Sequence, residues 1–327
     1  MRRRDFISLL GGAAASWPFG ASAEPAGKIW RVGQVFPGTP GAWGRNAQAF
    51  EQRLVGLGYR LGETLTLVNR FVAPEPKVLE DAIRLLIKEI DLLATHTTIV
   101  GVAAKKVAHD IPVVFMAVGA PVEIGLVESL ARPGGNMTGI TFEAATETYG
   151  KRLQILKEIV PRLTRAVVLG AEDDANFKFA LESVERVALL LGVTTISINF
   201  RAGDKLAVKF DEMLRKGAEG LIVVAGARTY QNRQEIADLA LSSHLPSCHA
   251  LTETVTAGGL VGLGPDPLDL AAQGATLVDK IIHGAKPAEL PVQQPDRYLL
   301  HINLRTARAL GLTVPDSLLA RADEVIE

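Results

Sequence analysis

One stretch near the middle of the chain decides how the rest is organised, Ala131-Arg132-Pro133-Gly134-Gly135-Asn136-Met137-Thr138-Gly139-Ile140-Thr141. Proline fixes φ, and glycine and asparagine tolerate positive φ, so residues 133–136 favour a turn. Residues 137–141 then favour a short strand. On both sides of the stretch, apolar β-rich runs alternate with helical periods. We therefore interpret it as the bridge between two α/β lobes, with a loop inside one large α/β domain as the alternative.

Length and composition describe an ordinary globular protein. The chain has 327 residues, of which 48% are hydrophobic and 22% charged, and its net charge is −1. A charge so close to zero gives no reason to expect a nucleic-acid groove or a polybasic membrane face. The single cysteine, Cys248, cannot form an internal disulfide, and no Cys/His spacing suggests a metal site. No apolar run reaches the roughly 18 residues of a membrane-spanning helix.

The N-terminus has the three parts of an export signal. Arginines at positions 2–4 precede an apolar run at 7–15, and Ala21-Ser22-Ala23 fits an A-x-A cleavage site. We therefore expect residues 1–23 to be a signal peptide and the mature protein to be periplasmic. Arg3-Arg4-Asp5-Phe6-Ile7 resembles the twin-arginine consensus, which leaves that route and the general secretory route both open. A frayed N-terminal helix of a cytosolic protein is the alternative.

Before the bridge, four expected strands alternate with amphipathic helical periods. These strands are residues 29–36, 65–71, 90–94 and 111–118. A β-α-β-α-β-α-β order implies a parallel sheet with right-handed crossovers. After the bridge the pattern restarts, with strands expected at residues 166–170, 193–200, 220–224, 246–249, 260–264 and 298–303. The fold class is therefore α/β.

In open α/β sheets, ligands bind beyond the carboxyl ends of the strands. The loops at these ends are residues 37–44, 95–98, 119–122, 171–174, 225–230 and 249–254. A cleft between two lobes is a favoured place for a small molecule. We therefore expect these loops to surround a ligand site.

Residues 95–98 read Thr-His-Thr-Thr and open an expected helix. Hydroxyl groups and free backbone N–H groups at a helix start suit an anion such as a carboxylate. We predict that Thr95, Thr97 and Thr98 hold the anionic end of a solute, with N-capping by threonine as the structural alternative. His96 could be a general base or a metal ligand, although a lone loop histidine is more often neither.

Further candidate ligand-binding residues lie in or beside the same loops. Phe36 and Tyr230 would pack the apolar part of a solute, and Glu172 or Glu253 would meet a positive group. The remaining candidates are Gly119, Ala120, Pro121 and Gly226. The sequence has no G-x-S-x-G elbow, P-loop or H-E-x-x-H, and no dinucleotide-type glycine spacing follows the first strand. We therefore predict a binding protein without catalytic residues, cofactor or metal.

Four segments resemble one known family. Residues 125–139 read Gly-Leu-Val-Glu-Ser-Leu-Ala-Arg-Pro-Gly-Gly-Asn-Met-Thr-Gly, and further similar segments are residues 278–292, 302–312 and 318–327. They are similar to signatures of ABC transporter substrate-binding proteins of the aromatic-amino-acid type. The resemblance extends over essentially the whole mature chain.

The resemblance implies a periplasmic-binding-protein fold, in which a multi-strand hinge joins two Rossmann-like lobes with parallel sheets. It implies a first lobe of residues 28–141 plus 265–287 and a second lobe of residues 142–264 plus 288–327. It also implies hinge closure around a small-molecule solute, which is delivered to an ABC transporter permease in the membrane. We expect a monomer. A ligand-sensing module that presents its bound state to a membrane receptor is the alternative, followed by a Rossmann-like enzyme.

The sequence departs from the family pattern at three places that we expect to face the cleft. Where the family often has Asp-Pro-Val after the fourth strand, this chain has Ala120-Pro121-Val122. A frequent Tyr-Gly is Leu263-Gly264, and a frequent Thr-Pro-Ala is His96-Thr97-Thr98. The carboxylate missing at Ala120 removes a partner for an ammonium or hydroxyl group. The departures therefore concern the ligand rather than the fold.

Overall fold

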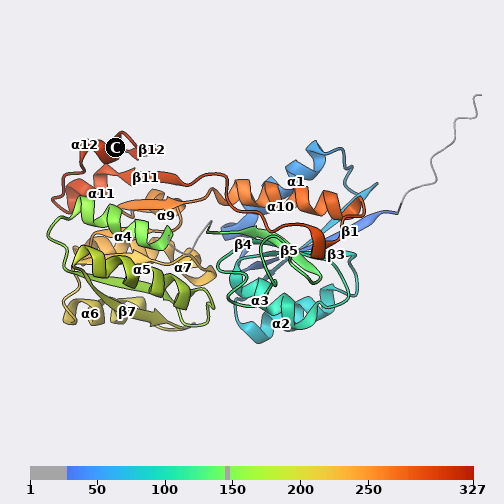
Figure 1. Cartoon of the computed structure of the whole chain (residues 1–327), viewed down its shortest axis with the longest axis horizontal. Coiled ribbons are helices and arrows are strands. Elements are labelled where there is room, and N and C mark those ends of the chain that lie inside the picture. Colours follow the sequence, from blue (N-terminus) through green and yellow to red (C-terminus); the bar gives the residue numbers. More distant parts are fainter. Residues whose placement is uncertain (1–27, 144–147) are drawn as a thin grey trace, which may run out of the picture.

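A computed structural model describes residues 28–143 and 148–327 and arranges them as two α/β lobes side by side (Figure 1). Within these ranges the strands form two sheets, one in each lobe. The expected export signal, residues 1–23, lies outside the described residues. In the described part of the chain, no helix has both the length and the apolar character needed to cross a membrane.

The first lobe contains a parallel sheet with the strand order β2-β1-β3-β4-β5. Its strands are β1 Trp30–Pro37, β2 Leu65–Val72, β3 Leu92–His96, β4 Val113–Val118 and β5 Met137–Thr141. Its helices are α1 Pro40–Gly56, α2 Pro76–Leu86, α3 Thr98–Val107 and α10 Pro267–Ile282. Helices α1 and α10 pack together on one face of the sheet, and α2 and α3 cover the other (Figure 1).

The second lobe contains a sheet with the order β12-β11-β10-β9-β8-β6-β7. Its strands are β6 Arg165–Ala171, β7 Thr194–Phe200, β8 Gly220–Val223, β9 Ser247–His249, β10 Val261–Gly264, β11 Leu299–Asn303 and β12 Glu324–Ile326. Its helices are α4 Thr148–Ile159, α5 Phe177–Leu191, α6 Leu206–Arg215, α7 Ala227–Gln231, α8 Arg233–Ser242, α9 Glu253–Thr256, α11 Leu304–Ala309 and α12 Asp316–Leu319. A short 3-10 helix, η1 Pro287–Glu289, precedes the return of the chain to this lobe.

Strand β11 is an exception to the parallel pairing that we expected within each lobe, because it runs antiparallel to β10. Strand β10 ends at Gly264, and the chain then builds α10 on the first lobe. The chain returns from that same side, so β11 starts opposite the end of β10 and runs the other way. Strand β12, which the sequence analysis did not identify, adds in parallel to β11 at the edge of the sheet.

The stretch around β5 holds the returning chain. The Gly139 carbonyl accepts a hydrogen bond from the Gln293 N–H, and the Thr141 N–H donates to the Gln293 carbonyl. The Thr138 hydroxyl donates to the Leu290 carbonyl at 2.8 Å. Residues 288–293 thus run along the free edge of β5, whereas we expected the second lobe to resume at residue 288. The division into lobes otherwise stays a prediction.

Glycine at position 139 is required for this arrangement. A Cβ built on Gly139 would lie 2.0 Å from the carbonyl oxygen of Phe115 in β4. Any larger residue would therefore push β5 away from β4, and with it the edge that holds the returning chain.

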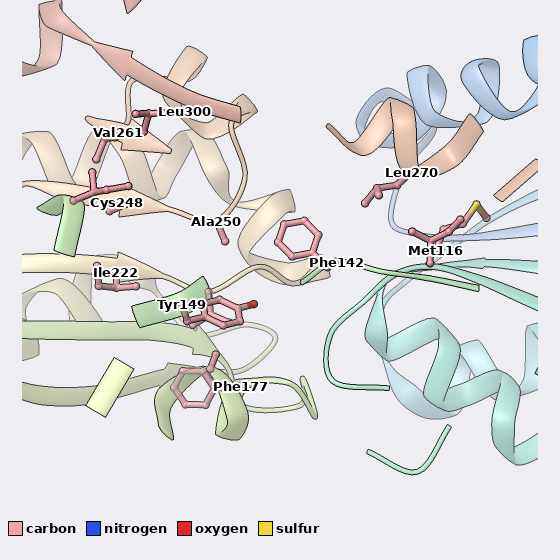
Figure 2. Packing of buried hydrophobic residues seen from close by; sticks show 14 of the residues in the cluster. Met116, Phe142, Tyr149, Phe177, Ile222, Cys248, Ala250, Val261, Leu270 and Leu300 are labelled. Carbon is pink, nitrogen blue, oxygen red and sulfur yellow. The ribbon is translucent and has the colours of Figure 1, made fainter. Parts of the chain in front are cut away.

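One cluster of buried apolar side chains has members in both lobes. Phe142, which directly follows β5, lies between Leu270 of the first lobe and Ala250 of the second (Figure 2). Cys248 belongs to the same cluster, and burial raises the pKa of its thiol to about 12. Cys248 is therefore an unreactive core residue.

A buried ion pair lies where the lobes join. The Arg152 guanidinium and the Glu143 carboxylate approach to 2.8 Å, and their side chains are 0% and 4% exposed. Arg152 also donates from Nε to the Leu263 carbonyl at 2.8 Å, at the end of β10. The Tyr298 hydroxyl hydrogen-bonds the Glu143 carboxylate just before β11. One pair thus contacts all three connections between the described parts of the two lobes.

Removing one member of this pair should destabilise the protein strongly. We expect Arg152→Met to cost about 3–5 kcal/mol in the free energy of unfolding, because it leaves the Glu143 carboxylate buried without its partner. The double variant Arg152→Met with Glu143→Gln should recover part of this loss. The measurement is urea unfolding followed by circular dichroism.

A matched control is Arg321→Met, since Arg321 pairs with Glu158 at the same 2.8 Å but on the surface, with side chains 55% and 40% exposed. It should change the unfolding free energy by less than about 1 kcal/mol. Equal, small effects of both single variants would contradict a special role for the buried pair.

Candidate functional site

A cavity with an empty volume of about 590 Å³, including space open to solvent, lies between the lobes, at the carboxyl ends of β1, β3 and β4. We call it the inner cavity. It is lined by Trp43, Asn46, His96, Thr97, Thr98, Met116, Ala117, Gly119, Phe142, Asn176, Ala225, Gly226, Tyr230, Leu251, Pro267 and Leu270. None of these residues is an acid, a lysine or an arginine.

The junction between β3 and α3 presents two hydroxyl groups to the inner cavity. Thr97 precedes α3 with φ at +72°, an uncommon and costly conformation for a β-branched residue. Its hydroxyl makes no capping bond, and its buried Oγ1 has no hydrogen-bond partner among the described residues. The Thr98 hydroxyl accepts the Gly119 N–H at 3.1 Å. The capping alternative therefore does not account for Thr97.

Thr95 lies on the other side of this junction and does not line the inner cavity. Side chains alternate along a strand, so Thr95 and His96 point to opposite faces of the sheet. The Thr95 hydroxyl is buried toward α3, with its oxygen 4.0 Å from the position that a Cβ on Gly101 would occupy. Thr95 therefore does not line the inner cavity, in contrast to its expected place in the cleft.

An aromatic wall bounds the inner cavity. The rings of Trp43 and Tyr230 have centroids 4.7 Å apart, one from each lobe. The His96 ring stacks on Phe36 at 4.1 Å, and Phe36 stacks on Phe71 at 5.0 Å. Phe36 is fully buried and supports His96 from behind rather than lining the cavity, which corrects its expected place.

His96 is a neutral member of this wall. Burial lowers its pKa to about 3, and its Nε2 lies 3.2 Å from the Gln34 side-chain oxygen. In residues 28–143 and 148–327, no group of three or more His, Cys, Asp or Glu side chains could hold a metal ion. The geometry thus favours a packing role for His96 over metal binding.

In the loop after β4, Gly119 lines the inner cavity, whereas the next two residues do not. The β4–β5 register shifts between Phe115 and Val118, and Ala117 and Ala120 adopt positive φ of 57° and 47°. A Cβ on Gly119 would lie 2.2 Å from Cγ of Asn176 in the opposite lobe.

Ala120 and Pro121 do not line the inner cavity, in contrast to our prediction. Their carbonyl groups instead accept the N–H groups of Ile124 and Leu126, which closes the turn. Their role is therefore to shape the loop.

The two candidate acids also lie outside the inner cavity. Glu172 forms an ion pair with Arg201 on the surface of the second lobe, and the Arg201 hydrogen bond lowers the Glu172 pKa. Glu253 lies in an adjoining hollow instead. Of the other candidates, Gly226 and Tyr230 do line the inner cavity. That any of these residues binds a solute stays a prediction.

Several lining residues escaped the sequence analysis. Trp43 falls inside the candidate loop 37–44, and Asn46 follows three residues later on the same face of α1, so helical spacing could have indicated both. Asn176 lies two residues beyond the loop 171–174, and its side-chain amide donates to the Tyr149 hydroxyl at 2.8 Å. The sequence around Pro267 and Leu270 does not indicate that they line the cavity. Helix α10 is brought to the cavity by its packing on the first lobe, which only the folded structure shows.

Helix α7 of the second lobe rests on the first lobe beside the cavity. The Gln231 amide donates to the Pro37 carbonyl at 3.0 Å. The Arg228 guanidinium donates to the Pro74 carbonyl at 3.0 Å while it pairs with Asp173 of its own lobe at 2.7 Å. The lobes are therefore in direct contact across the cleft in this structure.

Comparison with known proteins supplies the family. The chain is 25% identical over 273 residues to a tyrosine-binding protein of Clostridioides difficile, a match that covers 81% of this chain and 76% of that protein. A conserved domain protein of Vibrio cholerae has a TM-score of 0.85 at 24% identity, covering 91% of this chain and 100% of that one. A domain from Streptococcus pneumoniae, solved in complex with L-Trp, has the same TM-score and coverages at 21% identity.

The two solved structures show that this chain has the fold of periplasmic binding proteins. The sequence pattern of the family described as ABC transporter substrate binding protein matches residues 45–326, which is most of the chain. The chain therefore belongs to the family of ABC transporter substrate-binding proteins.

Proposed function

We propose that this protein binds a small aromatic solute with a single carboxylate group in the inner cavity and delivers it to a membrane permease. The family consists of solute-binding proteins rather than enzymes, and such proteins are typically exported. Export to the periplasm, by the twin-arginine or the general secretory route, is part of the proposal.

The observation that carries this proposal is an uncharged aromatic cavity with hydroxyl groups at a helix start. Trp43, Tyr230 and Phe142 offer apolar surface to a ring. Among the described residues, the Thr97 hydroxyl has no hydrogen-bond partner, and the backbone N–H groups in the first turn of α3 have no carbonyl within the helix to which they can donate. A carboxylate placed there would gain charge-assisted hydrogen bonds and the favourable end of the helix dipole.

A free amino acid suits the inner cavity less well than a simple carboxylate. Its ammonium group would be buried among side chains that carry no negative charge, and an unpaired buried charge costs several kcal/mol.

An aromatic amino acid remains the second candidate, because the relatives named above include a tyrosine-binding protein and a complex with L-Trp. Asp174 would supply the counter-charge, since its carboxylate oxygen lies 2.5 Å from the position of a Cβ on Gly226, which lines the cavity. Burial raises the pKa of Asp174 to about 7, and neighbouring Asp173 adds to the rise. An ammonium group beside it would favour the ionised form.

Closure of the lobes would retain the solute and provide the signal that the permease reads. Helix α7 and the Gly119–Asn176 contact already join the lobes on either side of the inner cavity. A hinge at the three connections permits opening without disturbing either sheet.

The proposed solute class is tested with three probes that share a phenyl ring and a three-carbon chain. We expect 3-phenylpropanoate to bind more tightly than L-phenylalanine, which adds an ammonium group, and than 3-phenylpropan-1-ol, which lacks the carboxylate. Thermal shift and titration calorimetry measure this, since a ligand at a hundredfold excess over its Kd stabilises the folded state by about 2.7 kcal/mol. If L-phenylalanine binds more tightly than 3-phenylpropanoate, the solute is an aromatic amino acid and not a simple aromatic carboxylate.

The hydroxyl groups are tested by replacing Thr97 and Thr98 with alanine. The double variant should weaken binding of an aromatic carboxylate by about 1–3 kcal/mol, because hydrogen bonds to a buried anion are lost. Thr95→Ala is the control, since that hydroxyl lies behind the sheet and should leave the affinity unchanged. Unchanged affinity in the double variant would remove the start of α3 from the site.

Closure is tested at Gly119. Gly119→Ala should weaken solute binding by about 1–3 kcal/mol, since its Cβ would overpack against Asn176 only when the lobes meet. Small-angle scattering should show less compaction on adding solute. Gly135→Ala is the control, because a Cβ there meets no atom within 4 Å. Normal compaction of the Gly119 variant would show that this contact does not limit closure.

A further inference from the structure

Two side chains of α7 bind backbone carbonyl groups of the first lobe. The Arg228 guanidinium donates to the Pro74 carbonyl at 3.0 Å, and the Gln231 amide donates to the Pro37 carbonyl at 3.0 Å. Both acceptors are prolines, whose fixed φ restricts the local backbone. We call these two hydrogen bonds the latch. None of the four residues that form it lines the inner cavity.

The Arg228 side chain is held in position by its own lobe. Its Nε and one terminal nitrogen both bind the Asp173 carboxylate, at 2.8 Å and 2.7 Å. This two-point contact fixes the plane of the guanidinium group, and the same terminal nitrogen also reaches the Pro74 carbonyl. The Glu75 carboxylate of the first lobe lies 3.6 Å from it. One buried guanidinium group thus faces an acid from each lobe, which favours contact between the lobes.

The latch lies at the edge of the first sheet that is farther from the connections between the lobes. The strand order in this sheet is β2-β1-β3-β4-β5. Residues 141–143 continue from β5 and residues 288–293 run along it, whereas Pro37 ends β1 and Pro74 follows β2. When a rigid lobe rotates about a hinge, the points farthest from the hinge move most. Opening at the connections would therefore break the latch.

Helix α7 also contributes to the aromatic wall of the inner cavity. Tyr230 lies between Arg228 and Gln231 in the sequence, and its ring centroid is 4.7 Å from that of Trp43 in the first lobe. The Trp43 indole N–H donates at 2.6 Å to the Pro37 carbonyl, which is the carbonyl that also accepts from Gln231. The latch therefore positions the two rings of the wall relative to each other.

We infer that Arg228 and Gln231 hold the lobes closed through contacts that involve no solute, and that they thereby set the affinity of the inner cavity without touching what it binds. The apparent Kd of a ligand is its intrinsic Kd divided by the fraction of molecules in the binding-competent state. A latch that raises the closed fraction therefore strengthens the binding of every solute by the same factor. This inference rests on the lobe closure of the proposed function, but not on the proposed class of solute.

The experiment measures the ratio of closed to open molecules by single-molecule energy transfer in the full chain, without added solute. Dyes are attached at Leu85→Cys on α2 and Leu190→Cys on α5, since these residues are 66% and 86% exposed, whereas Cys248 is buried. We expect the protein with an intact latch to be mainly closed. Gln231→Ala should lower the ratio about two- to tenfold and Arg228→Met about tenfold or more, because a neutral and a charged hydrogen bond are lost.

Arg201→Met is the matched control. Arg201 pairs with Glu172, the neighbour of Asp173, and both residues belong to the second lobe. This variant should leave the ratio of closed to open molecules unchanged, and thermal unfolding of each variant checks that it is folded. An equal ratio with and without the latch would overturn the inference. A protein that is mainly open although its latch is intact would do so as well.

A second readout separates the latch from the proposed solute class. Both latch variants should weaken the binding of 3-phenylpropanoate and of 3-phenylpropan-1-ol by the factor by which the closed fraction falls. The Thr97→Ala, Thr98→Ala double variant should weaken only the carboxylate and leave the closed fraction unchanged. A fall in the closed fraction with unchanged affinity for a probe that binds would overturn the inference. If neither probe binds, the proposed solute class fails, while the ratio measured without solute still decides whether the latch holds the lobes closed.

Discussion

The buried ion pair of Glu143 and Arg152 is the constraint on which the two-lobed arrangement depends. Two charges withdrawn from water are costly unless they pair, and the contacts of this pair come from all three connections between the lobes. The pair also reaches toward the cavity. The Arg152 guanidinium lies 4.5 Å from the Tyr149 ring centroid, and the Tyr149 hydroxyl holds Asn176, which meets Gly119 of the other lobe. A continuous series of contacts therefore links the ion pair at the lobe connections to the residues that line the inner cavity.

Most of the fold could be predicted from local sequence, because strand and helix periods are properties of a few consecutive residues. Strand β5 begins and ends where the sequence places it, at Met137 and Thr141. What local sequence could not show is the path of the returning chain. Residues 288–293 lie along β5, and β11 runs antiparallel, because α10 ends on the first lobe and the chain must come back from that side. The resemblance to the family indicated the crossing but not where it ends.

The candidate site was predictable only as a set of loops. The loop that contains His96, Thr97 and Thr98 does line the inner cavity, since parallel strands place their carboxyl ends together. Which side chains of a loop face inward depends on strand alternation and on neighbours far away in sequence. Thus Thr95 turns to the opposite face, and Glu172 is drawn outward by Arg201. Asn176 enters because its amide is held by a tyrosine on another helix.

The inner cavity has no charged lining residue, whereas the adjoining hollow that contains Glu253 has several, and desolvation explains this difference. In the inner cavity, a charged side chain without a partner would cost more than a solute could repay, so hydroxyl and backbone groups are the suitable anion ligands there. The adjoining hollow that contains Glu253 also contains Arg45, Arg233 and Asp266, and it includes space open to solvent. Tyr230 lies on the boundary, with an aromatic contact to Trp43 on one side and the Arg233 guanidinium on the other. A single side chain on α7 therefore separates a compartment suited to apolar surface from one suited to charge, and both compartments are completed only when the lobes meet.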